Sequence, residues 1–128
     1  MFVTKTTEGI EVQGESFFVP ERSAPERSVY FFGYRIRIFN HSLKTVQLLT
    51  RHWVITDGEG VVQEVRGAGV IGAQPTLGPG DSFSYTSACP LGTPVGTMEG
   101  SYRMEIAPDS FLDVAIPAFT LAAPNALN

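Results

Sequence analysis

The stretch GAGVIGAQPTLGPG, residues 67–80, decides the fold class of this chain. Its first six residues have the G-x-G-x-x-G spacing of dinucleotide-binding turns. Such turns need a strand before the glycines and, after them, a helix whose N-terminal N–H groups hold the pyrophosphate. A strand is predicted at 61–65, but Pro75 and Pro79 follow, and proline removes a helix donor and clashes with the preceding turn. The motif therefore lies in an all-β context, without the helix that its nucleotide-binding mechanism requires.

Outward from this stretch, apolar residues alternate with polar ones along most of the chain. Residues 30–38 place aromatic and aliphatic side chains on one face and Arg35 and Arg37 on the other. Residues 98–106 alternate in the same way, and shorter runs of this kind lie at 10–13, 82–86 and 112–116. A period of two is typical of half-buried antiparallel strands.

The segment 46–55 differs because it is apolar on both faces. Val46, Leu48 and Val54 are expected on one face, and Leu49, Trp53 and Ile55 on the other. A strand that is covered on both sides has this pattern, so we place it centrally in its sheet. Trp53 is then a core residue rather than a catalytic one.

Turn residues separate the predicted strands. Asn40-His41-Ser42 and residues 57–60 are hairpin signals, and residues 78–81 form a tight turn. About seven strands with short polar connections predict a sandwich of two antiparallel sheets, with a small closed barrel as the alternative. We expect one domain over residues 1–128, with a flexible tail at about 122–128.

Composition excludes several classes of function. The 128 residues carry a net charge of −4, which disfavours a nucleic-acid-binding face. The single cysteine, Cys89, cannot form an internal disulfide, which fits a reducing compartment. No signal-peptide pattern occurs, and no apolar run approaches the ~20 residues of a membrane span, so we expect a cytoplasmic protein with no membrane insertion.

Several stretches together resemble the bacterial ApaG family, of the ApaG/CorD type, and the resemblance covers nearly the whole chain. They are residues 47–57, 65–75, 83–87, 96–102 and 116–119. One departure is Ala88-Cys89-Pro90, which stands where the family pattern has a glycine-containing turn.

This resemblance implies a fibronectin type III-like or immunoglobulin-like β-sandwich. It also implies an association with cobalt resistance and magnesium efflux, and a gene that often neighbours one for a diadenosine tetraphosphate hydrolase. Related domains in eukaryotic F-box proteins and in a DNA polymerase delta interacting protein resemble protein-binding modules. The family supplies no catalytic residues to carry over.

The glycine motif is the first candidate site. Gly67, Gly69 and Gly72 could hold a phosphate in a nest of backbone N–H groups, with Arg51 or Arg66 as the nearby cation. The favoured interpretation is that these glycines allow positive φ in a sheet-to-sheet crossing. Alternation puts Arg51 on the same face as Trp53, where it caps the core edge or presents a cation to an anion.

Metal and nucleophilic sites are not predicted. The possible ligands are His41, His52, Cys89, Asp57, Glu59 and Asp81, and none has the spacing of a zinc or calcium site. No metal or cofactor is therefore expected. Cys89 with a distant histidine could form a nucleophile pair, but no neighbouring residue activates the thiol.

The sequence thus favours a non-enzymatic binding module. We expect it to dock a protein partner through an open sheet edge or its loops. The alternative is a sensor that binds an anionic nucleotide, such as a dinucleoside polyphosphate, through the Gly67–Gly72 loop. An enzyme is the least favoured class.

Overall fold

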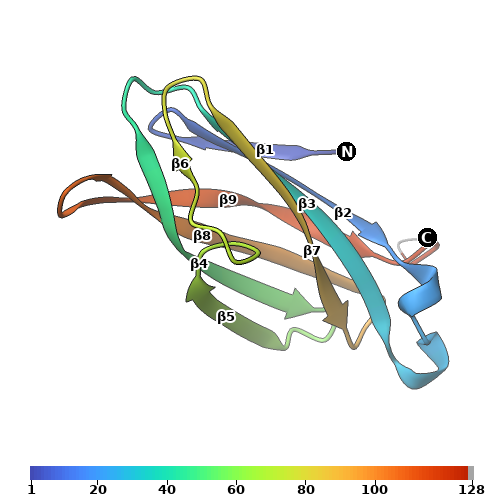
Figure 1. Cartoon of the computed structure of the whole chain (residues 1–128). Helices are drawn as coiled ribbons and strands as arrows, with labels where there is room; N and C mark the ends of the chain where they lie inside the picture. Colours follow the sequence, from blue (N-terminus) through green and yellow to red (C-terminus); the bar gives the residue numbers. More distant parts are fainter. Residues whose placement is uncertain (127–128) are drawn as a thin grey trace.

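The computed structural model describes residues 1–126 as two antiparallel sheets packed face to face (Figure 1). The first sheet contains β1 (Val3–Thr7), β2 (Ile10–Phe18), β3 (Tyr30–Asn40) and β7 (Ser82–Leu91), in the order β1-β2-β3-β7. The second contains β4 (Val46–Asp57), β5 (Val62–Ala68), β8 (Val95–Ala107) and β9 (Ser110–Ala122), in the order β5-β4-β8-β9, and β6 (Thr76–Leu77) also pairs with β4. The predicted all-β sandwich is confirmed.

Two of these strands were not expected from the sequence. In β1 the first four residues are exposed and largely polar, so they show no alternation, and the strand exists because it pairs with β2. β6 has only two residues, which pair with Val46 and Gln47 of β4. Pro75 before β6 and Gly78 after it bound the strand, so no periodic pattern can develop.

The expected double covering of the segment 46–55 is wrong. β4 does lie inside its sheet, between β5 and β8, but its pairing with β8 shifts register between Leu48 and Thr50. The extra residue, Leu49, moves the inward positions by one, so Val46 and Leu48 share the inner face with Trp53 and Ile55. Unbroken alternation assigns these apolar residues to two faces, but the bulge brings them onto one face of a half-buried strand.

The predicted hairpin at Asn40-His41-Ser42 is also wrong, because β3 and β4 lie in different sheets. The segment crosses between the sheets, and fully buried Asn40 organises the crossing. Its Nδ2 donates to the carbonyl oxygens of Lys44 and Leu77, at 2.7 and 2.9 Å. The hairpin at residues 57–60 and the tight turn at 78–81 are present as predicted.

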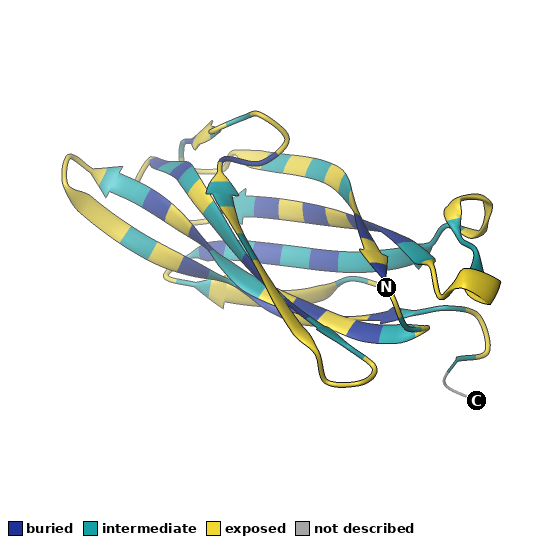
Figure 2. Ribbon diagram, turned by 90° about the horizontal axis from the view of Figure 1, so that it is seen from below, coloured by how far each residue is buried: buried dark blue, intermediate teal, exposed yellow. Residues whose placement is uncertain are grey.

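The core lies between the two sheets, and buried and exposed residues alternate along the strands (Figure 2). Trp53 is 2% exposed and packs edge-on against Tyr34 and Phe119, at ring-centroid distances of 5.2 and 6.0 Å. The Tyr102 side chain is fully buried, and its hydroxyl is hydrogen-bonded to that of Tyr85. The predicted core position of Trp53 is confirmed.

Helical structure within residues 1–126 is limited to two 3-10 turns, η1 (Pro20–Arg22) and η2 (Pro25–Arg27), and neither could cross a bilayer. Near the other end of the chain β9 ends at Ala122, and the Ala123 N–H donates to the Pro94 carbonyl oxygen at 2.8 Å. Of the tail expected to be flexible, 122–128, residues 127 and 128 lie outside the described part of the chain.

Replacing Trp53 by alanine should lower the free energy of unfolding by about 3–5 kcal/mol, because it removes buried apolar surface and leaves a cavity. Chemical denaturation followed by circular dichroism measures the change. His52→Ala is the matched control, because the His52 side chain points outward and its surface contact with Glu64 is worth at most about 1 kcal/mol. Equal midpoints for the two variants would contradict the core position of Trp53.

Candidate binding site on the open side of the sandwich

The two long sides of the sandwich differ in how they are closed. On one side β9 packs against β1 and β2, and the Ser16 hydroxyl donates to the Thr120 carbonyl oxygen at 2.6 Å. On the other side β5 pairs only with β4, and β7 pairs only with β3, within residues 1–126. Each of these two strands therefore has a free edge, and the glycine motif lies beside one of them.

The glycine motif is the end of β5 followed by a tight two-residue turn. Val70 and Ala73 exchange both backbone hydrogen bonds, at 2.8 and 2.9 Å. The residues between them, Ile71 and Gly72, have φ of 48° and 72°. Positive φ at both central positions is the requirement of a type I′ turn. This segment links β5 to β6 along one edge of β4, so the predicted sheet-to-sheet crossing comes later, at residues 78–81.

The turn is fixed to the bulge in β4. The Leu49 carbonyl oxygen accepts from the Gly69 N–H at 2.8 Å and from Gln74 Nε2 at 2.9 Å. Gly69 has a φ of 64°, and a Cβ there would lie 2.3 Å from the Ala73 carbonyl oxygen. Val70 is 1% exposed and belongs to the core. The segment is therefore a packed structural element anchored at both ends.

Arg51 and Gly67 form the other part of the candidate site. They are directly opposite each other on β4 and β5, and an added Cβ on Gly67 would lie 2.8–2.9 Å from the guanidinium atoms. Because Gly67 has no side chain, Arg51 can extend across β5. Its Nη1 then donates to the carbonyl oxygens of Ala68 and Gly69, at 3.0 and 2.9 Å. Gly67 thus makes room for a cation, a role that the sequence pattern did not reveal.

The five residues predicted for an anion site are only partly brought together. Arg51, Gly67 and Gly69 are in contact. The glycine motif, however, presents carbonyl oxygens and not N–H groups to the Arg51 guanidinium. Arg66 is 72% exposed and lies on the outer face with Glu64, at 3.5 Å, but it lines a shallow surface hollow together with Arg51 and Gly67. Gly72 lies at the turn, where neither its N–H nor that of Ile71 donates a backbone hydrogen bond within residues 1–126.

A cavity of about 240 Å³ lies between the free edges of β5 and β7. Arg51 and Trp53 of β4 line it, together with Val65 of β5 and Cys89 of β7. Burial raises the pKa of the Cys89 thiol to about 11, so little thiolate forms at neutral pH. This cavity combines a cation, aromatic surface and two free strand edges.

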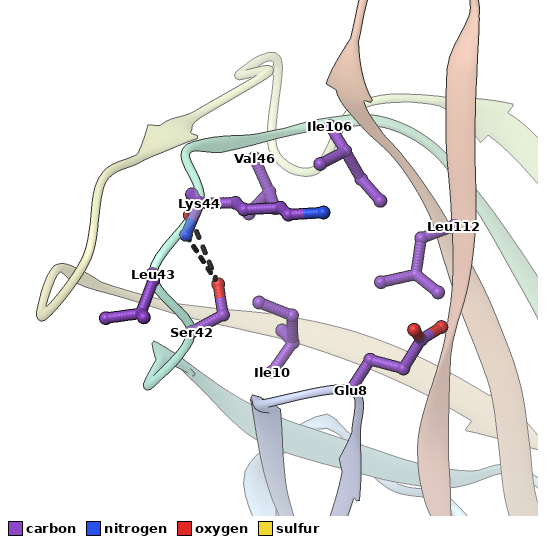
Figure 3. A pocket seen from close by; sticks show the side chains of 8 residues that line it. All are labelled: Glu8, Ile10, Ser42, Leu43, Lys44, Val46, Ile106 and Leu112. Carbon is purple, nitrogen blue, oxygen red and sulfur yellow. Dashed lines mark hydrogen bonds between the residues drawn. The ribbon is translucent and has the colours of Figure 1, made fainter.

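Two other hollows have less specific chemistry. The one in Figure 3, of about 270 Å³, lies at an end of the sandwich with Ile10, Val46, Ile106 and Leu112 in its walls and Lys44 extended across it. Most of its lining residues are apolar, and the polar ones are Glu8, Lys44 and Ser42, which is already hydrogen-bonded to the backbone of Lys44. A polar hollow on the outer face of the second sheet, where His52 and Arg66 contact Glu64, is lined by Thr50, His52, Arg66, Ser101, Arg103 and Asp113.

The possible metal ligands are scattered. His41 and His52 each hydrogen-bond a glutamate, Glu11 and Glu64, at 2.7 Å. Asp57 and Asp81 accept hydrogen bonds from backbone N–H groups in their turns. No group of three or more histidine, cysteine or acidic residues that could hold a metal ion occurs in the described part of the chain.

Gly69→Ala should destabilise the protein more than Gly72→Ala. Both residues have positive φ, which costs an L-residue about 1–2 kcal/mol. Only at Gly69 does the new Cβ also meet a backbone oxygen, whereas at Gly72 nothing lies within 4 Å. Urea denaturation of the two variants measures the difference. Equal losses would show that Gly69 is not packed as described.

Comparison with known proteins places these features in a family. The ApaG domain family matches residues 20–106. The protein ApaG of Methylobacterium sp. (strain 4-46) is 56% identical over 119 residues, covering 93% of this chain and 92% of that protein. The protein ApaG of Paramagnetospirillum magneticum (strain AMB-1) is 51% identical over 122 residues, covering 95% and 94%.

Solved structures agree with the fold. The crystal structure of the putative ApaA protein from Bordetella pertussis has a TM-score of 0.86 and 46% identity, covering 95% of this chain and 96% of that one. The C-terminal domain of wzt, at a TM-score of 0.55 and 9% identity, shares only the fold. The fibronectin type III-like sandwich that the resemblance implied is therefore confirmed. With a domain match over most of its length and relatives more than half identical to it, the chain belongs to the ApaG family.

Proposed function

We propose that this chain is a non-enzymatic protein-binding module whose partner adds an extended strand to the free edge of β5. The observation that carries the proposal is the exposed apolar surface at the two ends of this edge. Val61, Val62 and Ile71 are 60%, 57% and 63% exposed. A free strand edge supplies main-chain hydrogen bonds to an added strand, and apolar side chains beside it supply affinity.

The other sheet edges are less suited to strand addition. β1 is five residues long and carries Lys5. β9 contains Pro117 and is packed against β1 and β2, and β7 contains Pro90. Charged side chains (lysine above all), proline, short length and covering are ways in which proteins protect edge strands. β5 has neither lysine nor proline, its charged residues Glu64 and Arg66 pair with each other, and Arg51 occupies only the Ala68 carbonyl oxygen at its end.

Ile71 provides a second line of support. A β-branched residue in the left-handed region is an outlier, which costs about 1–2 kcal/mol relative to a residue suited to it. Its side chain is largely exposed, so packing within the chain does not offset this cost. Backbone strain at an exposed apolar residue supports a role in contacts with a partner.

The titratable residues support a binding role over catalysis. Both histidines hydrogen-bond glutamates rather than a serine, threonine or cysteine, and the Cys89 thiol has a raised pKa. A nucleotide sensor has less support, because the glycine motif offers carbonyl oxygens to Arg51. On this proposal the module acts in the cytoplasm, and the family's association with cobalt resistance and magnesium efflux arises through the partner.

Photo-crosslinking tests the docking edge. Val62 is replaced by p-benzoylphenylalanine, and Lys5 of β1 is replaced in a matched control. After irradiation of cells that express the full chain, the Val62 position should give an adduct of discrete mass that mass spectrometry identifies as one protein. The Lys5 position should not. Adducts of equal yield at both positions, or none at Val62, would contradict docking along β5.

Ile71→Asn should increase stability and decrease partner binding. Asparagine tolerates positive φ, so the free energy of unfolding should rise by about 1 kcal/mol. The yield of the Val62 adduct should fall, because the apolar contact at the turn is lost. Denaturation and crosslinking of the same variant provide the two measurements. If the variant is less stable, or if its crosslinking is unchanged, Ile71 is not a strained contact residue.

A further inference from the structure

Trp53, one of the residues that line the cavity between β5 and β7, has a buried hydrogen-bond donor without an acceptor. Trp53 lines this cavity and is 2% exposed. Its indole Nε1 is the one buried side-chain nitrogen or oxygen within residues 1–126 that has no hydrogen-bond partner. Leaving a buried donor unpaired is unfavourable, so native proteins rarely do so without a reason. Because this nitrogen is fully buried, an acceptor from outside the chain can bond to it only after a side chain of the cavity wall moves.

The same cavity contains a cation without a counter-ion. Arg51 is partly buried, and within residues 1–126 no carboxylate lies within 4.0 Å of it. Its bonds go to the neutral carbonyl oxygens of Ala68 and Gly69 through Nη1. Arg35 and Arg66 each have a glutamate partner, and the other arginines without one, Arg22, Arg27, Arg37 and Arg103, are exposed to solvent. The Nη2 and Nε groups of Arg51 take no part in these two bonds. The guanidinium can therefore still donate to an anion.

We propose that this cavity binds a carboxylate, supplied by an acidic side chain of the strand that docks on β5. A carboxylate has two acceptor oxygens, which suit an indole N–H and a guanidinium at once. Gln63 and Val65 of β5 form one wall of the cavity, so every second side chain of a strand added to β5 would face into it. This inference rests on the proposed function and specifies the residue that the partner presents.

The single tryptophan of the chain makes a direct test possible, because its indole N–H gives one cross peak in a ¹H–¹⁵N correlation spectrum. The probes are three blocked pentapeptides, threonine-valine-X-valine-threonine, in which X is glutamate, glutamine or lysine. The glutamate peptide should shift the indole peak saturably. The glutamine peptide should bind at least ten times more weakly, and the lysine peptide should leave the peak in place. No shift with glutamate, or equal shifts with lysine, would overturn the proposal.

A matched pair of variants tests the cation. Arg51→Met should abolish the shift caused by the glutamate peptide, and Arg66→Met, on the outer face of β5, should leave it unchanged. An unchanged shift in Arg51→Met would overturn the role of Arg51. The peptide series on the unmodified chain remains decisive if Arg51→Met does not fold.

The Val62 crosslink separates this inference from the proposed function. If wild-type chain shows no response to the glutamate peptide but still forms the Val62 adduct, the docking edge stands and the carboxylate site fails. If the adduct is absent while the indole peak responds, the cavity binds carboxylates and docking along β5 fails.

Discussion

The extra residue in β4 is the constraint on which the rest of this structure depends. Leu49 has no partner on β8, and the strand changes register around it. This change places Val46 and Leu48 before the bulge, and Trp53 and Ile55 after it, in the same core. It also leaves the Leu49 carbonyl oxygen to accept from Gly69 and Gln74. One irregularity therefore joins the core to the turn that ends β5.

The consequence for function is the position of Arg51. After the bulge it lies on the inner face, in line with Trp53, and Gly67 opposite leaves space for the guanidinium to cross β5. A cation is thus held at the open side of the sandwich, between two strands that have free edges. The glycines, which look like phosphate ligands in the sequence, contribute instead to building a site in which arginine and tryptophan are the donors.

Those parts of the fold that depend on local pattern were predictable from the sequence. Alternation in β3, β8 and β9 identified the inward faces, because each strand has one face in the core. The same reasoning failed in β4, since a bulge and a double covering give the same run of apolar residues. It also failed at Asn40, whose turn chemistry is compatible with a hairpin or with a crossing between sheets. The family resemblance, rather than periodicity, narrowed the sandwich to the fibronectin type III-like type.

The candidate site was predictable only in part. The shared face of Arg51 and Trp53 followed from alternation after residue 50. The cavity did not, because it needs β7 to lie across from β5, and only the pairing of β7 with β3 determines that position. The role of Gly67 also depends on a cross-strand neighbour 16 positions away in the sequence, Arg51. Long-range pairing carries this information, and local pattern does not.

Amide hydrogen exchange distinguishes a glycine segment that is fixed to the bulge of β4 from an open anion-binding loop. The Gly69 N–H, bonded to Leu49, should exchange slowly with solvent deuterium, as should those of Val70 and Ala73. The amides of Ile71 and Gly72 at the turn should exchange rapidly. If Gly69 exchanges as fast as Gly72, the segment is not anchored to the bulge, and the account of the site built upon it is contradicted.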